Sequence, residues 1–178
     1  MEAAEAGVLS GSGVAIWEEL FPGARMHAYD RYLVNIRNNT PFLQSRGAFS
    51  RHGLPQMHDF DQSQPHLYPK LEDIMMSPTS KFFYIIDDAS HSVPFTLNTF
   101  KYFEPYFDLR GAYIIEDINV PNANAFRAGL DPSWDMWICP DPTSFWVLNK
   151  MPSDPRHALK VASAISKLGF RKWPHELR

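Results

Sequence analysis

The hydrophobic residues of this chain fall into short blocks separated by polar or amphipathic stretches. The blocks that we interpret as β-strands are residues 3–9, 25–29, 56–60, 82–86 and 112–115. The stretches between them predict helices at residues 13–21, 35–46, 67–76 and 93–107. The block 82–86 is continuously apolar, which is typical of a strand buried on both faces of a parallel sheet.

The helical spacing of apolar residues predicts which side of each helix faces the core. In the first helix this side consists of Gly13, Ile16, Trp17 and Leu20. In the helix over 93–107 it consists of Val93, Leu97, Phe100, Phe103 and Phe107. Residues 109–111 predict a turn into the next strand.

Strands that alternate with helices predict an α/β fold, with a Rossmann-like, doubly wound and mainly parallel sheet that has helices on both faces. The pattern changes after residue 118, and residues 119–133 are expected to form a loop. Segments 134–139 and 144–149 predict an antiparallel C-terminal hairpin, and residues 155–168 predict a final helix. We expect residues 1–178 to form a single domain.

Composition narrows the class of protein. Hydrophobic residues make up 44% of the 178 residues, more than a disordered chain contains. The net charge of −3, without a basic block, argues against a nucleic-acid partner. The single cysteine, Cys139, excludes an internal disulfide and a zinc site of several thiolates. No apolar run approaches the roughly 20 residues that cross a bilayer, and the acidic start differs from a secretory signal. We expect a cytoplasmic protein without a membrane partner; homo-oligomerisation stays open.

Two features after the first two strands suggest a nucleoside-containing ligand. In open α/β sheets, ligands bind outside the carboxyl ends of the strands. The glycine-rich stretch from Gly7 to Gly13 brings backbone close to a ligand, although a tight strand-to-helix turn would also explain it. Asp30 stands where a carboxylate can accept hydrogen bonds from ribose hydroxyls, or it is a solvated turn residue.

Acidic residues also follow the next two predicted strands. Asp87 and Asp88 precede His91, and Glu116-Asp117 end the neighbouring strand. Converging carboxylates of this kind suit Mg²⁺, or Mn²⁺ on the same ligands. The alternative is that these residues cap helix N-termini, which would leave one of the two acidic pairs unexplained.

These motifs resemble class I S-adenosylmethionine-dependent methyltransferases over residues 5–118. Within that class the chain is most similar to the metal-dependent macrolide and rhamnosyl O-methyltransferases and their cephalosporin hydroxylase-like relatives. The resemblance rests on the segments 5–13, 59–63, 85–91 and 114–118, together with Trp17, Phe21-Pro22 and Asp30. Of these, I-D-D-x-S-H and I-E-D are the specific motifs. Relatives carry helices before the first strand, so the chain is expected to lack that part.

The resemblance implies a role for each matching residue. S-adenosylmethionine would be bound at its methionine end by Glu5, Gly7 and Gly11, at its ribose by Asp30, and at its adenine by Asp61 and Gln62, with Asp87 also on the cofactor side. Mg²⁺ or Mn²⁺ would be bound by Asp88, Glu116 and Asp117, with His91 as the general base. The implied reaction is methylation of a hydroxyl on a small-molecule acceptor, a sugar or natural product.

Two other functions remain open from the sequence. A non-catalytic or truncated methyltransferase-like protein would keep the fold and bind a partner. A metal-dependent oxygenase or hydrolase would use His91 with the carboxylates, although the iron triad of two histidines and one carboxylate needs a second histidine in the cluster.

Overall fold

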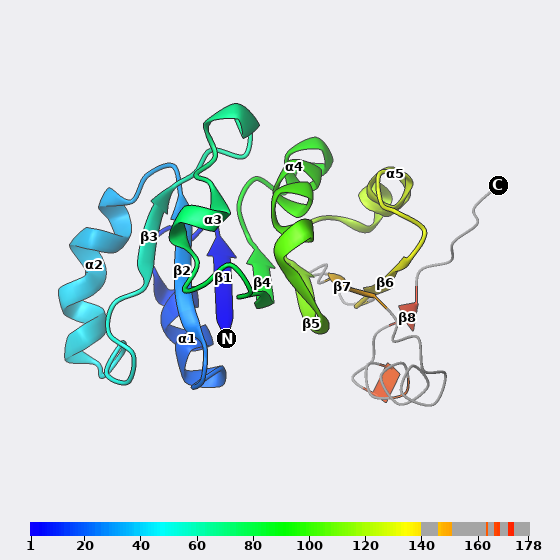
Figure 1. Cartoon of the computed structure of the whole chain (residues 1–178). Helices are drawn as coiled ribbons and strands as arrows, with labels where there is room; N and C mark the ends of the chain where they lie inside the picture. Colours follow the sequence, from blue (N-terminus) through cyan, green and yellow to red (C-terminus); the bar gives the residue numbers. More distant parts are fainter. Residues whose placement is uncertain (140–145, 151–162, 164–165, 168–170, 173–178) are drawn as a thin grey trace.

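The computed structural model describes residues 1–139, 146–150, 163, 166–167 and 171–172. Its strands form one mixed sheet in the order β3-β2-β1-β4-β5-β7-β6-β8 (Figure 1). The strands are β1 Glu2–Ala6, β2 Arg25–Asp30, β3 Gln56–Asp59, β4 Phe82–Asp87, β5 Phe107–Ile115, β6 Trp134–Ile138, β7 Trp146–Lys150 and β8 Arg171–Lys172. β1 to β5 pair in parallel, whereas β7, β6 and β8 are antiparallel. The predicted α/β fold and C-terminal hairpin are therefore confirmed.

Helices cover both faces of this sheet (Figure 1). They are α1 Ser12–Leu20, α2 Val34–Ser45, α3 Leu71–Ile74, α4 Val93–Phe103 and α5 Ala123–Ala128, with short 3₁₀ turns at η1 Pro65–Leu67, η2 Glu104–Tyr106 and η3 Val120–Asn122. Buried residues of α1 and α2 pack in one hydrophobic cluster, and those of α3, α4 and α5 pack in another. The two clusters lie on opposite faces because successive side chains of a strand alternate between faces, as Ala3 and Ala4 do.

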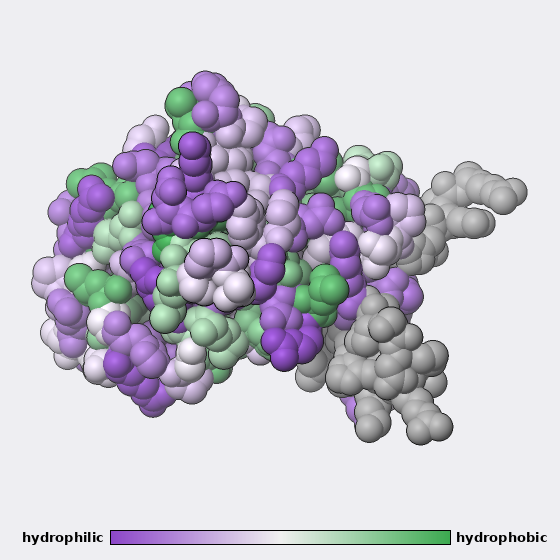
Figure 2. All heavy atoms as spheres, in the orientation of Figure 1, coloured by the Kyte–Doolittle hydropathy of each residue, from purple (hydrophilic) through white to green (hydrophobic). Residues whose placement is uncertain are grey.

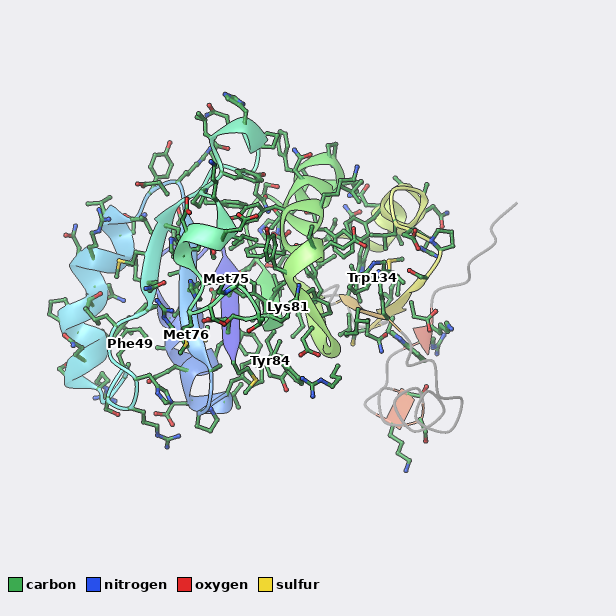
Figure 3. All side chains as sticks on the ribbon, viewed as in Figure 1. Phe49, Met75, Met76, Lys81, Tyr84 and Trp134 are labelled. Carbon is green, nitrogen blue, oxygen red and sulfur yellow. The ribbon has the colours of Figure 1, made fainter. Side chains whose placement is uncertain are left out.

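Aromatic rings make up much of the larger cluster. Trp134 of β6 lies toward α5 (Figure 3) and packs edge-on against Phe100 of α4, with 5.0 Å between ring centroids. Its indole Nε1 donates a hydrogen bond to Glu104 at 2.7 Å, so its polar atom is satisfied although the side chain is buried.

The inward side of α1 differs from the prediction. Val14 and Glu18 are the buried residues, whereas Ile16 and Leu20 are each 59% exposed. Glu18 can be buried because its Oε2 accepts a hydrogen bond from the backbone N–H of Phe49 at 2.9 Å. The buried side of α1 therefore includes a hydrogen-bonded carboxylate, whereas the spacing of apolar residues predicted only apolar side chains and glycine there.

Several predicted boundaries are also wrong. β1 ends at Ala6, because Gly7 turns the chain with φ +89°. The helix predicted over 93–107 ends at Phe103, and the helix at 67–76 is reduced to α3. The predicted loop 119–133 contains α5. The helix predicted at 155–168 lies outside the described residues apart from 163 and 166–167.

Residues 109–111 belong to β5 rather than to a turn. The β4–β5 register moves from Phe82 opposite Phe107 to Tyr84 opposite Ala112, so β5 carries the extra residues as a bulge. A bulged strand contains polar residues and glycine, as a turn does. This similarity explains why residues 109–111 were predicted to form a turn.

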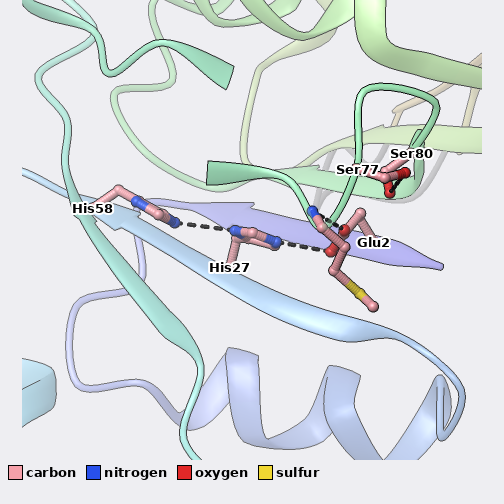
Figure 4. A network of polar contacts seen from close by, with 6 residues as sticks. Glu2, His27, His58, Ser77 and Ser80 are labelled. Atoms are coloured by element: carbon pink, nitrogen blue, oxygen red, sulfur yellow. Dashed lines mark hydrogen bonds and ion pairs between the residues drawn. The ribbon is translucent and has the colours of Figure 1, made fainter. Parts of the chain in front are cut away.

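A buried chain of hydrogen bonds crosses the amino-terminal part of the sheet (Figure 4). His27 contacts Glu2 Oε2 through Nε2 at 2.9 Å and His58 through Nδ1 at 3.0 Å. The other oxygen of Glu2 accepts the backbone N–H of Met76 at 3.1 Å. Burial lowers the pKa of His58 to about 4, so this imidazole is neutral at pH 7. The network joins β1, β2 and β3 to the segment before β4.

Polar side chains cover most of the face seen in Figure 2, with small separated hydrophobic patches. Among the described residues, no helix has the length and apolar character needed to span a membrane.

Candidate active site

The carboxyl ends of the parallel strands are held side by side by backbone hydrogen bonds that continue past the strands. Gly7 N–H donates to Tyr29 at 2.8 Å, and Asp88 N–H donates to Ala6 at 2.9 Å. Glu116 N–H in turn donates to Asp87 at 2.9 Å. The ends of β2, β1, β4 and β5 therefore form a continuous edge, as the α/β prediction required.

At Gly7 the turn after β1 comes very close to the backbone that follows β4. A Cβ atom there would lie 2.3 Å from the carbonyl oxygen of Asp88 and 2.5 Å from the Cα of Ala89. Its φ of +89° is also a conformation that side-chain-bearing residues rarely adopt. Gly11, which precedes α1, has φ +82°. The backbone conformation therefore favours glycine at both positions, Gly7 and Gly11.

A cavity of about 550 Å³ opens above this edge. It is lined by Gly7, Asp30, Arg31, Phe60, Asp61, Gln62, Ser63, Ala89, Ser90 and Phe95. The cavity thus contains four of the residues that the resemblance assigns to cofactor binding. The remaining three, Glu5, Gly11 and Asp87, lie outside its lining.

Asp30 and Asp61, two half-buried carboxylates that line the cavity, are fixed by local hydrogen bonds. Asp30 accepts the backbone N–H of Leu9 at 3.0 Å and that of Tyr32 at 2.7 Å, one on each carboxylate oxygen. Asp61 accepts the hydroxyl and the backbone N–H of Ser63, which hold the pKa of this carboxyl below its usual range. Both carboxylates are held in place as acceptors facing the cavity.

The side chains of Gln62 and Asp87, which the resemblance assigns to cofactor binding, lie largely buried at the cavity. They are only 5% and 2% exposed and hydrogen-bond each other at 2.7 Å. Burial raises the pKa of Asp87 to about 7. Gln62 therefore lines the cavity, and Asp87 supports it from outside the lining.

A row of carboxylates crosses the edge on the face that carries α1. Glu5 pairs with Ile86, and Ile86 pairs with Ile114. Strand alternation therefore places Asp88 and Glu116, two positions further along, on the same face as Glu5. Burial, followed by repulsion from Asp88, raises the pKa of Glu116 to about 7. Burial also raises the pKa of Asp88. Carboxylates that disfavour one another's charge favour a cation beside them.

Glu5 is the most deeply buried carboxylate of this row. It is 3% exposed, and its Oε2 has no hydrogen-bond partner among the described residues. Burial, then the charges of Asp88, Glu116 and Asp30, raise its pKa to about 8. An uncompensated buried carboxyl is costly, so the fold keeps a feature here that stability does not explain.

His91 lies beside the carboxylate row. One ligand atom each from Asp88, His91 and Asp117 lies within 4.8 Å of the others. Glu116, which the resemblance places among the metal ligands, is not part of this group; its carbonyl instead accepts a hydrogen bond from His91 Nδ1 at 3.2 Å. His91 and Asp117 both have φ +54°, and strained residues of this kind cluster at functional sites.

Arg31 and Phe95 line the cavity although the sequence did not single them out. Phe95 is 36% exposed in the first turn of α4. The sequence held a signal for each of them. Arg31 directly follows Asp30, and Phe95 is an aromatic residue in the first helical turn after the acidic segment 87–91.

No protein-family model and no curated protein matches the sequence. Solved structures match the fold. The SAH-bound methyltransferase PaMTH1 of Podospora anserina has a TM-score of 0.58 and 14% identity, over 85% of this chain and 72% of that chain. Human methyltransferase-like protein 13 in complex with SAH has a TM-score of 0.58 and 12% identity, over 94% of this chain and 81% of that chain.

The ribosomal protein L11 methylase of Lactobacillus delbrueckii subsp. bulgaricus also matches, with a TM-score of 0.58 and 14% identity, over 83% of this chain and 68% of that chain. This chain therefore has the fold of S-adenosylmethionine-dependent methyltransferases. The resemblance to the narrower metal-dependent O-methyltransferases stays a prediction.

Proposed function

We propose that this chain is an S-adenosylmethionine-dependent methyltransferase. The observation that carries the proposal is the cavity at the carboxyl edge of the sheet. Gly7 and the carboxylate of Asp30, which is held by hydrogen bonds, both line this cavity. A nucleoside needs a backbone free of side chains and an acceptor for its ribose hydroxyls, and both are present. Proteins of the same fold have been solved with SAH.

We further propose that the acceptor is a hydroxyl of a small molecule and that a divalent cation assists. Asp88 and Asp117 supply carboxylate oxygens, the ligands that Mg²⁺ and Mn²⁺ prefer, and Glu116 lies next to them. The raised pKa values of Glu5 and Glu116 support a cation here, because positive charge would relieve their repulsion. The residues present therefore fit the metal.

S-adenosylmethionine supplies an activated methyl group when bound, and a divalent cation makes a hydroxyl easier to deprotonate. The chain supplies position and a proton acceptor. Because Nδ1 of His91 donates to the Glu116 carbonyl, the Nε2 of the neutral imidazole keeps its lone pair. His91 can therefore take the proton of the acceptor hydroxyl.

Isothermal titration calorimetry with SAH tests the cofactor site. We expect wild-type protein to bind SAH and Asp30→Asn to bind it roughly 10- to 100-fold more weakly, because a charged acceptor for the ribose is lost. Asp59→Asn is the matched control, since this exposed carboxylate ends the neighbouring strand outside the cavity lining. Folded wild-type protein that binds neither SAH nor S-adenosylmethionine would refute the proposed function.

Electron paramagnetic resonance of Mn²⁺ tests the metal site. We expect Asp117→Asn to weaken Mn²⁺ binding at least about tenfold through the loss of one charged ligand. Asparagine also tolerates the positive φ of this position, so the fold should be kept. His91→Gln should retain Mn²⁺ affinity and lose methylation rate. Equal losses of Mn²⁺ affinity in the two variants would make His91 a metal ligand instead of the base.

A further inference from the structure

Gln62 is placed where three segments of the cavity wall meet. Its Nε2 donates to Asp87 Oδ1 at 2.7 Å and to Thr99 Oγ1 at 2.6 Å. Its Oε1 accepts the backbone N–H of Ser90 at 3.1 Å. One carboxamide therefore joins the end of β4, the turn after β4 and helix α4.

The backbone of Gln62 is held as firmly as its side chain. Its carbonyl oxygen accepts hydrogen bonds from Asn98 Nδ2 at 3.1 Å and from the hydroxyl of Tyr68 at 2.9 Å. Bonds at both ends of the residue fix where the segment 60–63 runs relative to α4.

Asp87 explains why an amide is needed at this position. The carboxylate is 2% exposed and accepts from Gln62 on one oxygen and from Tyr113, at 3.1 Å, on the other. A buried acceptor that loses its donor destabilises the folded state. The length and polarity of glutamine match the donors and acceptors around it.

The bond between Gln62 and Ser90 connects the two walls of the cavity. Residues 60–63 line one wall, and Ala89 and Ser90 line the other. We infer that Gln62 is a positioning residue, whose carboxamide sets the separation of these walls and so the fit of the cofactor. The inference rests on the proposed function in one respect, that the cavity is the cofactor site.

The series Gln62→Met and Thr99→Val tests this role. Methionine keeps the length of the side chain and loses its bonds to Asp87 and Ser90. Valine at position 99 removes one bond of the same buried network and leaves the bond between the walls intact. We expect SAH affinity by calorimetry to fall roughly 10- to 100-fold in Gln62→Met and less than about threefold in Thr99→Val. Similar SAH affinity in both variants, whatever their melting temperatures, would overturn the inference.

Hydrogen exchange at Ser90 gives a measurement that does not depend on SAH. In Gln62→Met the Ser90 amide loses its acceptor, and we expect its protection to fall while Thr99→Val keeps it. Unchanged protection in Gln62→Met overturns the inference even if wild-type protein binds SAH. Lost protection in a protein that binds no SAH supports the wall contact and refutes only the proposed function. If Gln62→Met does not fold, Gln62→Asn, one methylene shorter, serves the same comparison.

Discussion

Gly7→Ala should destabilise the protein by about 3–5 kcal/mol and lower its SAH affinity more than about 100-fold. The added methyl group would lie 2.3 Å from the Asp88 carbonyl oxygen and 2.5 Å from the Ala89 Cα. Both are backbone atoms that also form the edge of the cavity, so relief of the contact must move the cavity wall. The φ of +89° adds strain that alanine cannot relieve.

Thermal unfolding and calorimetry measure the two effects of Gly7→Ala. For a chain of this length we expect a melting temperature lowered by roughly 10 °C or more. Gly23→Ala is the matched control, because a Cβ there meets only Met1 Cε at 3.6 Å, and its stability should stay within about 0.5 kcal/mol of wild type. A Gly7→Ala variant that binds SAH with wild-type affinity would contradict the assignment of this edge.

Glu5→Gln should stabilise the protein at alkaline pH. The folded state keeps the Glu5 proton up to about pH 8, whereas the unfolded state releases it near pH 4.5. Between these values the folded state binds more protons, so the free energy of unfolding of the wild type falls as pH rises. Glutamine has a similar shape and cannot ionise. The variant should therefore gain on the order of 2–4 kcal/mol over wild type by pH 9, and almost nothing at pH 4.

Urea unfolding at pH 4, 7 and 9 measures this gain for Glu5→Gln. Glu18→Gln is the matched control, since Glu18 is equally buried but lies outside the carboxylate row, and one of its oxygens accepts the backbone N–H of Phe49. A gain of the same size in Glu18→Gln would show that the effect is not specific to the position of Glu5. A constant difference between Glu5→Gln and wild type across this range would show that Glu5 ionises normally in the folded protein.

The sheet and the edge that carries the cavity could be predicted because they depend on local patterns. The apolar run before Asp87 and the glycines after β1 carry their signal in consecutive residues. The hydrogen bonds of Gln62 could not be predicted in the same way. The resemblance assigns Gln62 to cofactor binding, and its side-chain bonds are made with residues such as Thr99 and Ser90, which only the tertiary structure brings to it.

The same limit applies to Glu18 and to the bulge in β5. Hydrophobic spacing cannot show that a glutamate will meet a backbone N–H some thirty residues away, as Glu18 meets Phe49. Nor can the composition of 109–111 show whether the chain turns or remains in the sheet, since a bulge and a turn use similar residues.

The central position of β1 has a consequence for folding kinetics. β1 lies between β2 and β4, and its register places Glu2 opposite Phe82, so this pairing closes a loop of roughly eighty residues. Parallel pairings between distant segments are slow to form, and until β4 arrives one edge of β1 has no partner. We therefore expect the β1–β2–β3 part to exist transiently as an open-edged sheet. During refolding, aggregation should compete most strongly at the stage before β4 docks.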